Sequence, residues 1–550
     1  MVTVNILSGQ TLWQALQEQG YEVERPCGGN GLCKGCQVYV DGIGMVKSCQ
    51  FETEGSYLVE LPKKHSFDAV GEMLEVGLES GNVERDADTD TDGDAGLYRE
   101  IDARIGAAWQ KSWDANPVVA VDIGTTTVAM KLFYREMVYE TGFVNPQRLF
   151  GADVMSRIQA ANGGALKDMQ TILREKLYQE LRKLVLKCEA DTAINHCENK
   201  TNTIDKCSKD VCTFQFDDIS IIISANTTMQ HICRGLSCEG LGKAPFSPVT
   251  LDLEKTVKRC CEFRKTNSIE SGEERMMDEE IFLPGISAFV GADIVSGIYA
   301  LDMLEEEKPV LLLDLGTNGE MALGCKKKLL VASTAAGPAF EGSELAMQIH
   351  ASGIMRVLHE LIVCKNIDNY GTLVDKYFEN GYPVDMCGDE IAENGSIEAG
   401  SIEAGSSEAG SIEVGSSGTK DKLWMTQEDI REIQMAKGAI RAGIEMLLGA
   451  YGIAPEEVEK VYLAGGMGYY INPEDAVAIG LLPDAFLQKN TIQAVGNTSL
   501  QGAVRFLQEG EAAAVEKLHR ITDLAKEIVL ANTTRFHSLY MKYMNFEEES

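Results

Sequence analysis

The chain has 550 residues, of which 44% are hydrophobic and 24% charged, so it can bury the cores of several domains. Its formal net charge of −34 excludes the basic surface that nucleic-acid backbones require. No apolar stretch approaches the roughly 20 residues that span a bilayer. We therefore expect a soluble, cytoplasmic protein with neither nucleic-acid nor membrane partners.

The first 64 residues predict a small domain with two recognisable strands and one short helix. Met1–Leu7 and Gln37–Asp41 alternate apolar and polar residues as strands do. Leu12–Gln19 has the apolar spacing of a short amphipathic helix. Between helix and second strand lies a glycine-rich loop.

Four cysteines in and after this loop form the first candidate site: Cys27, Cys33, Cys36 and Cys49. Four thiolates are what a 2Fe-2S cluster requires, and the loop glycines let backbone amides turn toward the sulfurs. The spacing of the first two cysteines resembles that of vertebrate-type ferredoxins. Zinc and a disulfide pair are the alternatives, but zinc sites usually use two Cys-x-x-Cys pairs and disulfides are rare in the cytosol. The favoured interpretation is the cluster.

Residues 65–116 predict an acidic linker. Asp88, Asp90 and Asp92 precede Gly93 as in a calcium loop, but the twelfth position is Arg99, where such a loop needs a bidentate glutamate. Like charges repel, so we interpret the segment as solvated and extended.

Three turns that combine acidic residues or glycines follow apolar runs at Val118–Val121, Val310–Leu313 and Val461–Leu463. A glycine directly after a strand lets backbone N–H groups approach phosphate oxygens, and threonine or asparagine side chains add donors. The predicted nucleotide contacts are Gly124, Thr125, Thr126, Gly316, Thr317, Asn318, Gly465 and Gly466. Asp122 and Asp314 end their strands, where carboxylates suit hydrated Mg²⁺. The pattern predicts ATP with Mg²⁺ between two similar lobes.

In their order, these turns resemble the phosphate-1, phosphate-2 and adenosine motifs of the acetate and sugar kinase, heat-shock-cognate chaperone and actin superfamily. The resemblance implies two α/β, ribonuclease-H-like lobes, at 117–305 and 306–540. We expect an insertion near 188–215 in the first lobe. A second, disordered insertion is expected near 388–420, where Gly-Ser-Ile-Glu-Ala repeats with a period of five.

Two glutamates are candidates to orient the attacking water, and the sequence does not choose between Glu320 and Glu341. Together with Asp122 and Asp314 they make up the predicted catalytic set. His231 is interpreted as a structural histidine. Gln427–Leu448 has helical apolar spacing and predicts a helix behind the adenosine turn.

A cysteine-rich domain followed by an actin-like ATPase resembles the reductive activators of corrinoid proteins, which implies an α+β, ferredoxin-like (β-grasp) fold for residues 1–64. Further stretches carry the resemblance: Asn145-Pro-Gln147, Gly151-Ala-Asp-Val154, Asn226-Thr-Thr-Met-Gln-His231, Pro245-Phe-Ser-Pro248, Leu283-Pro-Gly-Ile-Ser287, Gly291-Ala-Asp293, Ala336-Gly-Pro-Ala-Phe-Glu-Gly342 and Gly496-Asn-Thr-Ser-Leu500.

This resemblance implies a function as well as a fold. ATP would drive the transfer of one electron from the cluster to cobalt(II) of a partner corrinoid protein, restoring cobalt(I), and a low-potential donor would reduce the cluster again. A homodimer is a candidate assembly. Two alternatives stay open: an electron carrier whose actin-like lobes sense nucleotide, and a small-molecule kinase with an attached redox domain. The remaining cysteines, such as Cys188, Cys197, Cys207 and Cys212, match no metal template.

Overall fold

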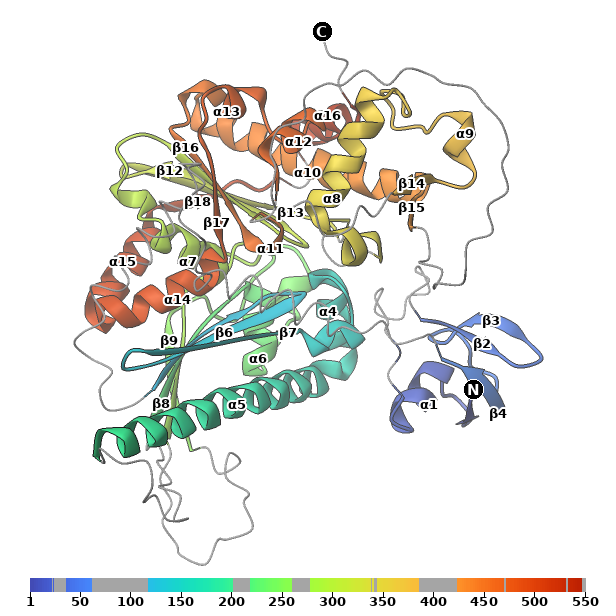
Figure 1. Cartoon of the computed structure of the whole chain (residues 1–550), viewed down its shortest axis with the longest axis horizontal. Coiled ribbons are helices and arrows are strands. Elements are labelled where there is room, and N and C mark those ends of the chain that lie inside the picture. The colour runs from blue at the N-terminus through green and yellow to red at the C-terminus, as the bar shows by residue number, and fades with distance from the viewer. Residues whose placement is uncertain are drawn as a thin grey trace, which may run out of the picture.

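The computed structural model describes residues 1–21, 23, 36–61, 117–200, 218–259, 277–337, 339–340, 344–384, 423–468, 471–530 and 533–546. Within them the chain forms an N-terminal unit and two larger lobes (Figure 1). The predicted linker at 65–116, the repeat near 388–420, Cys27, Cys33 and Glu341 lie outside the described residues.

The N-terminal unit is a four-stranded sheet packed against one helix. Its elements are β1 (Val2–Ile6), α1 (Leu12–Glu18), β2 (Gln37–Val40), β3 (Gly44–Lys47) and β4 (Gly55–Glu60), with sheet order β1-β4-β2-β3. Thr11 begins α1 with a capping box that includes Gln14. Leu12 and Leu16 are fully buried against the sheet, so this unit has a hydrophobic core of its own. Both predicted strands and the predicted helix are confirmed.

The first lobe is built on a six-stranded sheet of order β7-β6-β5-β8-β10-β9. Its strands are β5 (Val118–Ile123), β6 (Thr127–Tyr134), β7 (Met137–Val144), β8 (Asp218–Ala225), β9 (Glu254–Arg259) and β10 (Met277–Phe282). Its helices are η1 (Pro146–Leu149), α4 (Val154–Ala160), the π-helical η2 (Ala161–Ala165), α5 (Leu166–Lys200), α6 (Thr227–Arg234), η4 (Gly240–Gly242), α7 (Ala292–Ala300) and η5 (Met303–Glu305). The long α5 runs along the sheet in Figure 1 and continues to Lys200, into the region of the expected insertion.

The second lobe repeats this pattern in a sheet of order β17-β16-β11-β12-β13-β18. Its strands are β11 (Val310–Leu315), β12 (Gly319–Cys325), β13 (Lys328–Thr334), β16 (Lys460–Ala464), β17 (Ile492–Gly496) and β18 (Ala525–Glu527), beside the hairpin of β14 (Tyr382–Val384) and β15 (Leu423–Met425). In each lobe an antiparallel three-stranded meander is extended by two parallel strands, β8 and β10 in one, β16 and β17 in the other. The shared strand topology of the two sheets confirms the prediction of two similar α/β lobes.

The helices of the second lobe surround its sheet. They are α8 (Glu344–Val363), α9 (Asp375–Phe378), α10 (Gln427–Tyr451), η6 (Pro455–Glu457), α11 (Gly465–Gly468), α12 (Pro473–Ala478), α13 (Asp484–Gln488), α14 (Thr498–Glu509), α15 (Glu511–Leu524) and α16 (Thr534–Met544). Thr426 caps the predicted helix α10 in a capping box with Asp429, and Gly452 ends it in the left-handed conformation. Its apolar stripe is buried, as its spacing predicted.

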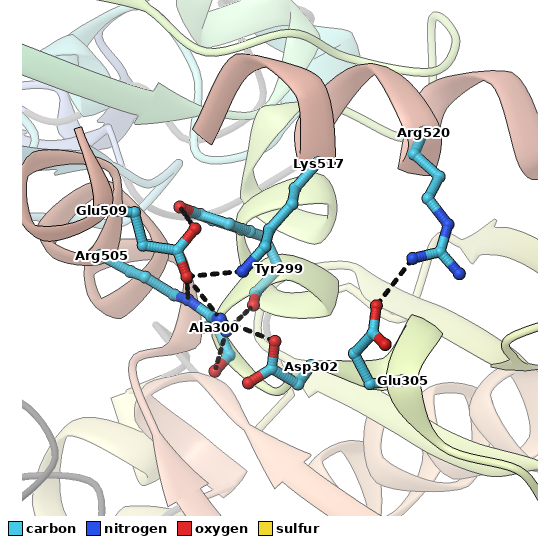
Figure 2. A network of polar contacts seen from close by, with 8 residues as sticks. All are labelled: Tyr299, Ala300, Asp302, Glu305, Arg505, Glu509, Lys517 and Arg520. Atoms are coloured by element: carbon cyan, nitrogen blue, oxygen red, sulfur yellow. Dashed lines mark hydrogen bonds and ion pairs between the residues drawn. The ribbon is translucent and has the colours of Figure 1, made fainter. Parts of the chain in front are cut away.

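The two lobes meet where α7 packs against α14. A Cβ atom at Gly502 of α14 would lie 2.4 Å from the carbonyl oxygen of Ser296 in α7, so only glycine permits this approach. Beyond the crossing, Arg505, Glu509 and Lys517 form a polar network with Tyr299 and Asp302 of the first lobe (Figure 2). None of the helices in the described parts of the chain is both long and apolar enough to cross a bilayer.

Candidate functional site

The two predicted phosphate turns lie against each other at the junction of the lobes. The Oγ1 atoms of Thr126, after β5, and Thr317, after β11, are 2.9 Å apart although 191 positions separate them in the chain. Each turn leaves a central strand of its own sheet, and the similarity of the two sheets brings the turns face to face. A ligand between the lobes would therefore contact both turns.

Asp122 lies at the end of β5 and is held by the second lobe. Its Oδ1 accepts a hydrogen bond from Ser499 Oγ at 2.6 Å, and its Oδ2 accepts one from Asn497 Nδ2 at 2.8 Å. Burial raises the pKa of the Asp122 carboxyl, and the two donors counteract this effect. The Gly496-Asn-Thr-Ser-Leu500 stretch thus fixes a carboxylate that is more than 370 residues earlier in the chain.

Asp314 and Glu320 face each other across the β11–β12 pair. Burial raises the pKa of Glu320 well above its usual range, and repulsion from Asp293 and Asp314 adds to the effect. The Asn318 side chain donates a hydrogen bond that partly offsets this rise. Of the two glutamates proposed to orient water, Glu320 is therefore placed beside the carboxylates, while Glu341 lies outside the described residues.

A fourth carboxylate, Asp293, belongs to the same group and was not predicted as a site residue. It lies in the first turn of α7. Burial is the main cause that raises its pKa to about 7, and repulsion from the negative charge of Asp122 adds to this rise. The signal that could have revealed it is the Gly291-Ala-Asp293 stretch, which puts an acidic residue at the start of a helix.

The two metal ligands predicted from the sequence belong to this group of carboxylates. In the part of the chain that the structure describes, no three His, Cys, Asp or Glu side chains are arranged to hold a bare metal ion. Mg²⁺ retains several waters and needs only one or two direct carboxylates. Asp122 and Asp314, each at the end of a strand, remain the predicted ligands.

The adenosine turn approaches the second phosphate turn through glycine. Gly465 has a φ of +85°, and a Cβ atom there would lie 2.5 Å from Asp314 Oδ1 and 2.7 Å from the carbonyl oxygen of Leu315. Gly465 and Gly466 begin α11 directly after β16, which pairs in parallel with β11. The turn at Gly316 is closed by a hydrogen bond from its N–H to the carbonyl oxygen of Asn318.

Two of the four predicted cluster cysteines lie side by side in the N-terminal unit. The Sγ atoms of Cys36 and Cys49 are 3.3 Å apart, and both side chains are buried. Ser48 fixes the segment between them, since its N–H and its hydroxyl both donate to the carbonyl oxygen of Cys36. Burial raises the pKa of the Cys36 thiol to about 11.

His231 is a structural residue, as its sequence context predicted. Its Nδ1 lies 2.7 Å from the carbonyl oxygen of Thr227, and its Nε2 accepts a hydrogen bond from the N–H of Val249 at 3.0 Å. Both ring nitrogens are therefore used within the first lobe. Cys188 is buried in α5, apart from this site.

Comparisons with known proteins give two family matches that cover both lobes. Residues 118–306 match the model described as the RACo middle region. Residues 308–550 match the model described as the C-terminal domain of RACo, the ASKHA domain. The second description is that of an actin-like ATPase fold, in agreement with the duplicated sheets.

Two named relatives and one solved structure are also similar to this chain. The chain is 28% identical over 457 residues to "Corrinoid activation enzyme RamQ" of Eubacterium limosum, covering 77% of this chain and 69% of the relative. It is 26% identical over 454 residues to the Co(II) methylated amine-specific corrinoid protein reductase of Methanosarcina barkeri, covering 78% and 76%. The fold matches the solved "Reductive activator for corrinoid,iron-sulfur protein" with a TM-score of 0.58 at 21% identity, over 100% of this chain and 99% of that one. The chain belongs to the RACo family of reductive activators of corrinoid proteins.

Proposed function

We propose that this protein uses ATP to return an inactive corrinoid protein from cobalt(II) to cobalt(I), so that the corrinoid can accept a methyl group again. The observation that carries the proposal is the meeting of the two phosphate turns at Thr126 and Thr317, with Asp122 and Asp314 at the two strand ends. The names of both curated relatives refer to the activation or reduction of corrinoid proteins.

In this proposal ATP binds at the junction of the lobes, between the two phosphate turns. The turns at Gly124–Thr126 and Gly316–Asn318 would hold the phosphates, Gly465 and Gly466 would lie under the adenosine, and Asp122 and Asp314 would bind the hydrated Mg²⁺. Glu320 would orient the water that attacks the terminal phosphate, with Glu341 as the other candidate. Hydrolysis would yield ADP and phosphate.

The N-terminal unit would hold the redox group. Its strand order and its helix α1 suit a ferredoxin-like (β-grasp) domain, and the buried pair Cys36 and Cys49 supplies two adjacent thiols. Thiolate sulfur is the ligand that iron–sulfur clusters require, so these residues fit a 2Fe-2S cluster completed by Cys27 and Cys33. When bound there, the cluster would supply the single electron that reduces cobalt(II), and a low-potential donor would replace that electron.

The coupling between ATP and electron transfer has a thermodynamic requirement. ATP can favour one arrangement of the lobes only if it binds that arrangement more tightly than the other. We propose that the nucleotide-closed form grips the corrinoid protein differently from the open form. The contacts from Asn497 and Ser499 to Asp122 would respond to closure, because they join the two lobes at the nucleotide.

The decisive experiment follows the absorbance change from cobalt(II) to cobalt(I). A corrinoid protein from the same cell would be mixed anaerobically with this protein and a low-potential reductant, with and without Mg-ATP. We expect cobalt(I) to accumulate only with ATP. If cobalt(I) forms equally well without ATP, the protein is an electron carrier, and if ATP is consumed only with a small-molecule acceptor, it is a kinase.

A further inference from the structure

Two side chains from the interior of the first lobe hold the backbone of the first phosphate turn. Asn145 Nδ2 donates to the carbonyl oxygen of Gly124 at 2.8 Å, and Arg157 Nη2 donates to the carbonyl oxygen of Thr125 at 2.5 Å. The same amide and guanidinium groups also contact the sulfur of Met229, at 3.7 Å and 3.0 Å. Met229 is fully buried in the lobe's core, so both carbonyl groups point inward, to the same side.

The orientation of these carbonyls fixes the direction of two backbone donors. In a planar trans peptide the C=O and the next N–H point in opposite directions. The N–H groups of Thr125 and Thr126 therefore point away from the core. Neither of them donates to a backbone carbonyl within the described residues. Successive free N–H groups of this kind form an anion-binding concavity.

Arg157 also brings a positive charge under the turn. Its side chain is completely buried in α4 and donates to neutral acceptors only, among them the carbonyl oxygens of Gly151 and Thr125. Over the described ranges it forms no ion pair, although the charge of Asp153 acts on it. Burial lowers the pKa of Arg157 to about 9, so the group stays protonated at neutral pH. A buried cation without a carboxylate partner is costly, and an anionic ligand nearby would offset that cost.

We propose that Arg157 and Asn145 are positioning residues for the nucleotide's phosphates: they aim the Thr125 and Thr126 N–H groups away from the core of the first lobe, toward the proposed nucleotide, and Arg157 adds a charge that favours a polyphosphate. This inference rests on the proposed ATP site. It assigns a role to the Asn145-Pro-Gln147 and Gly151-Ala-Asp-Val154 stretches, which contribute no side chain to the carboxylate group. It also predicts that the two residues affect phosphate-bearing ligands selectively.

The test compares the affinities of ATP, ADP and adenosine for the full chain by calorimetry with Mg²⁺. Arg157→Met should weaken ATP about tenfold or more and ADP less, while adenosine should stay within about twofold, because only the phosphates lie near the removed charge. Arg157→Lys should recover part of the ATP affinity, since it keeps the charge but loses the forked donors. Arg174→Met is the matched control. It removes a largely buried arginine of the same lobe that pairs with Glu280, and it should leave the ATP-to-adenosine ratio unchanged.

If Arg157→Met weakens the binding of ATP and of adenosine equally, Arg157 has only a structural role and the inference is overturned. An unchanged ATP affinity would overturn it too. Far-ultraviolet circular dichroism shows whether Arg157→Met folds. If it does not fold, the test rests on Arg157→Lys and Asn145→Ser. An unchanged ratio of ATP to adenosine affinity in both of these variants would overturn the inference. Asn145→Ser keeps a capping oxygen for the N–H of Gln147 but lacks the Nδ2 donor. A wild-type chain that binds no ATP would remove the proposed function too. If the wild-type chain reactivates the corrinoid but these variants keep the wild-type ratio of ATP to adenosine affinity, only this inference is overturned and the proposed function stands.

Discussion

Asp314 lies where the second phosphate turn and the adenosine turn come closest, so it is the residue on which the proposed chemistry depends most directly. We expect Asp314→Ala to lower ATP-dependent cobalt(I) formation by about a hundredfold or more, since it removes a charge next to the proposed metal and phosphate positions. The visible absorbance of the cysteine site should be unchanged, because the N-terminal unit has its own core. Stopped-flow absorbance measures both quantities.

Asp484→Ala is the control for this variant. Asp484 is exposed at the start of α13, and its loss should alter neither cobalt reduction nor the visible spectrum. Retention of most of the ATP-dependent rate by Asp314→Ala would contradict the assignment. Loss of activity together with the visible spectrum would show that the two units are not separable.

His231 gives a prediction about pH. Burial lowers the pKa of its imidazole below the usual 6.5, and Nε2 must remain unprotonated to accept the hydrogen bond from Val249. Because the folded-state pKa is depressed, this stability contribution is complete above about pH 6.5 and is lost as the pH falls. Between about pH 6.5 and 5.5 the free energy of unfolding should fall by up to about 1 kcal/mol from this group, the limit reached if the folded-state imidazole stays neutral. In His231→Gln this component should be absent.

Urea unfolding of both proteins at several pH values measures the difference in slope. His231→Gln also lowers stability at neutral pH by removing packing, so the slope and not the absolute value is the test. Parallel profiles for the two proteins would mean that His231 does not titrate in this range.

Site residues could be predicted from the sequence where their role depends on their own strand or turn. They could not be predicted where their role depends on a contact with a residue distant in the chain. Asp122 and Gly124 follow an apolar run, so the local sequence reveals their place. Arg157 lies in the last turn of α4, and its proposed role depends on its hydrogen bond to the carbonyl oxygen of Thr125, 32 residues away in the chain. Ser499 depends on Asp122 in the same way, across a much longer separation. No periodic pattern encodes such contacts.

At the scale of elements, the crossing of α7 and α14 determines how the lobes meet. Gly502→Val would place its Cβ atom 2.4 Å from the carbonyl oxygen of Ser296 and so force the helices apart. We expect a loss of roughly 1–3 kcal/mol in the free energy of unfolding, as for other overpacked sites. ATP affinity should also fall, because α14 carries Ser499 and begins next to Asn497, the residues that hold Asp122.

A matched glycine tests whether the effect comes from this contact. A Cβ atom added at Gly163 would meet no atom within 4 Å, so Gly163→Ala should be tolerated. Thermal unfolding and calorimetry would compare the two variants. Normal ATP affinity in a folded Gly502→Val protein would mean that the crossing does not control the nucleotide site.

Helices and strands could be predicted from the sequence more reliably than the pairing of the strands with one another. The apolar spacing of 427–448 predicted α10, which continues for three further residues, to Tyr451, before Gly452 ends it. The runs before the three turns became β5, β11 and β16. The parallel pairing of β5 with β8 could not be predicted in the same way, because it joins segments separated by helices and by the residues around 188–215.

At the scale of the whole molecule, the charged network of Figure 2 joins the lobes on the side of the crossing where α7 ends. Arg505 Nη2 lies 2.7 Å from Asp302 and 2.7 Å from Glu509, and its Nη1 donates to the carbonyl oxygen of Tyr299 at 2.5 Å. The Tyr299 hydroxyl donates to Glu509 at 2.9 Å. The guanidinium thus adds a charged donor to a carbonyl group in the last turn of α7, which also accepts the N–H of Asp302 at 3.3 Å.

Arg505→Met should lower the free energy of unfolding of the lobes by roughly 2 kcal/mol, because charged hydrogen bonds in a largely buried setting are lost. Arg520→Met is the comparison. Its ion pair with Glu305 also appears in Figure 2, but the arginine side chain is 43% exposed, against 18% for Arg505. The loss there should stay below about 1 kcal/mol. Equal losses in denaturant unfolding would contradict the ranking.

The small hairpin of β14 and β15 has a practical consequence for protein engineering. Val384 pairs with Leu423, so the chain leaves this hairpin and returns to it at neighbouring backbone positions. A short turn could close that gap at little entropic cost, because loop-closure entropy changes only slowly with length. Residues 385–422 are thus a natural place to excise the glycine-rich repeat or to graft a fluorescent reporter, leaving the phosphate turns and the cysteine pair at their native positions.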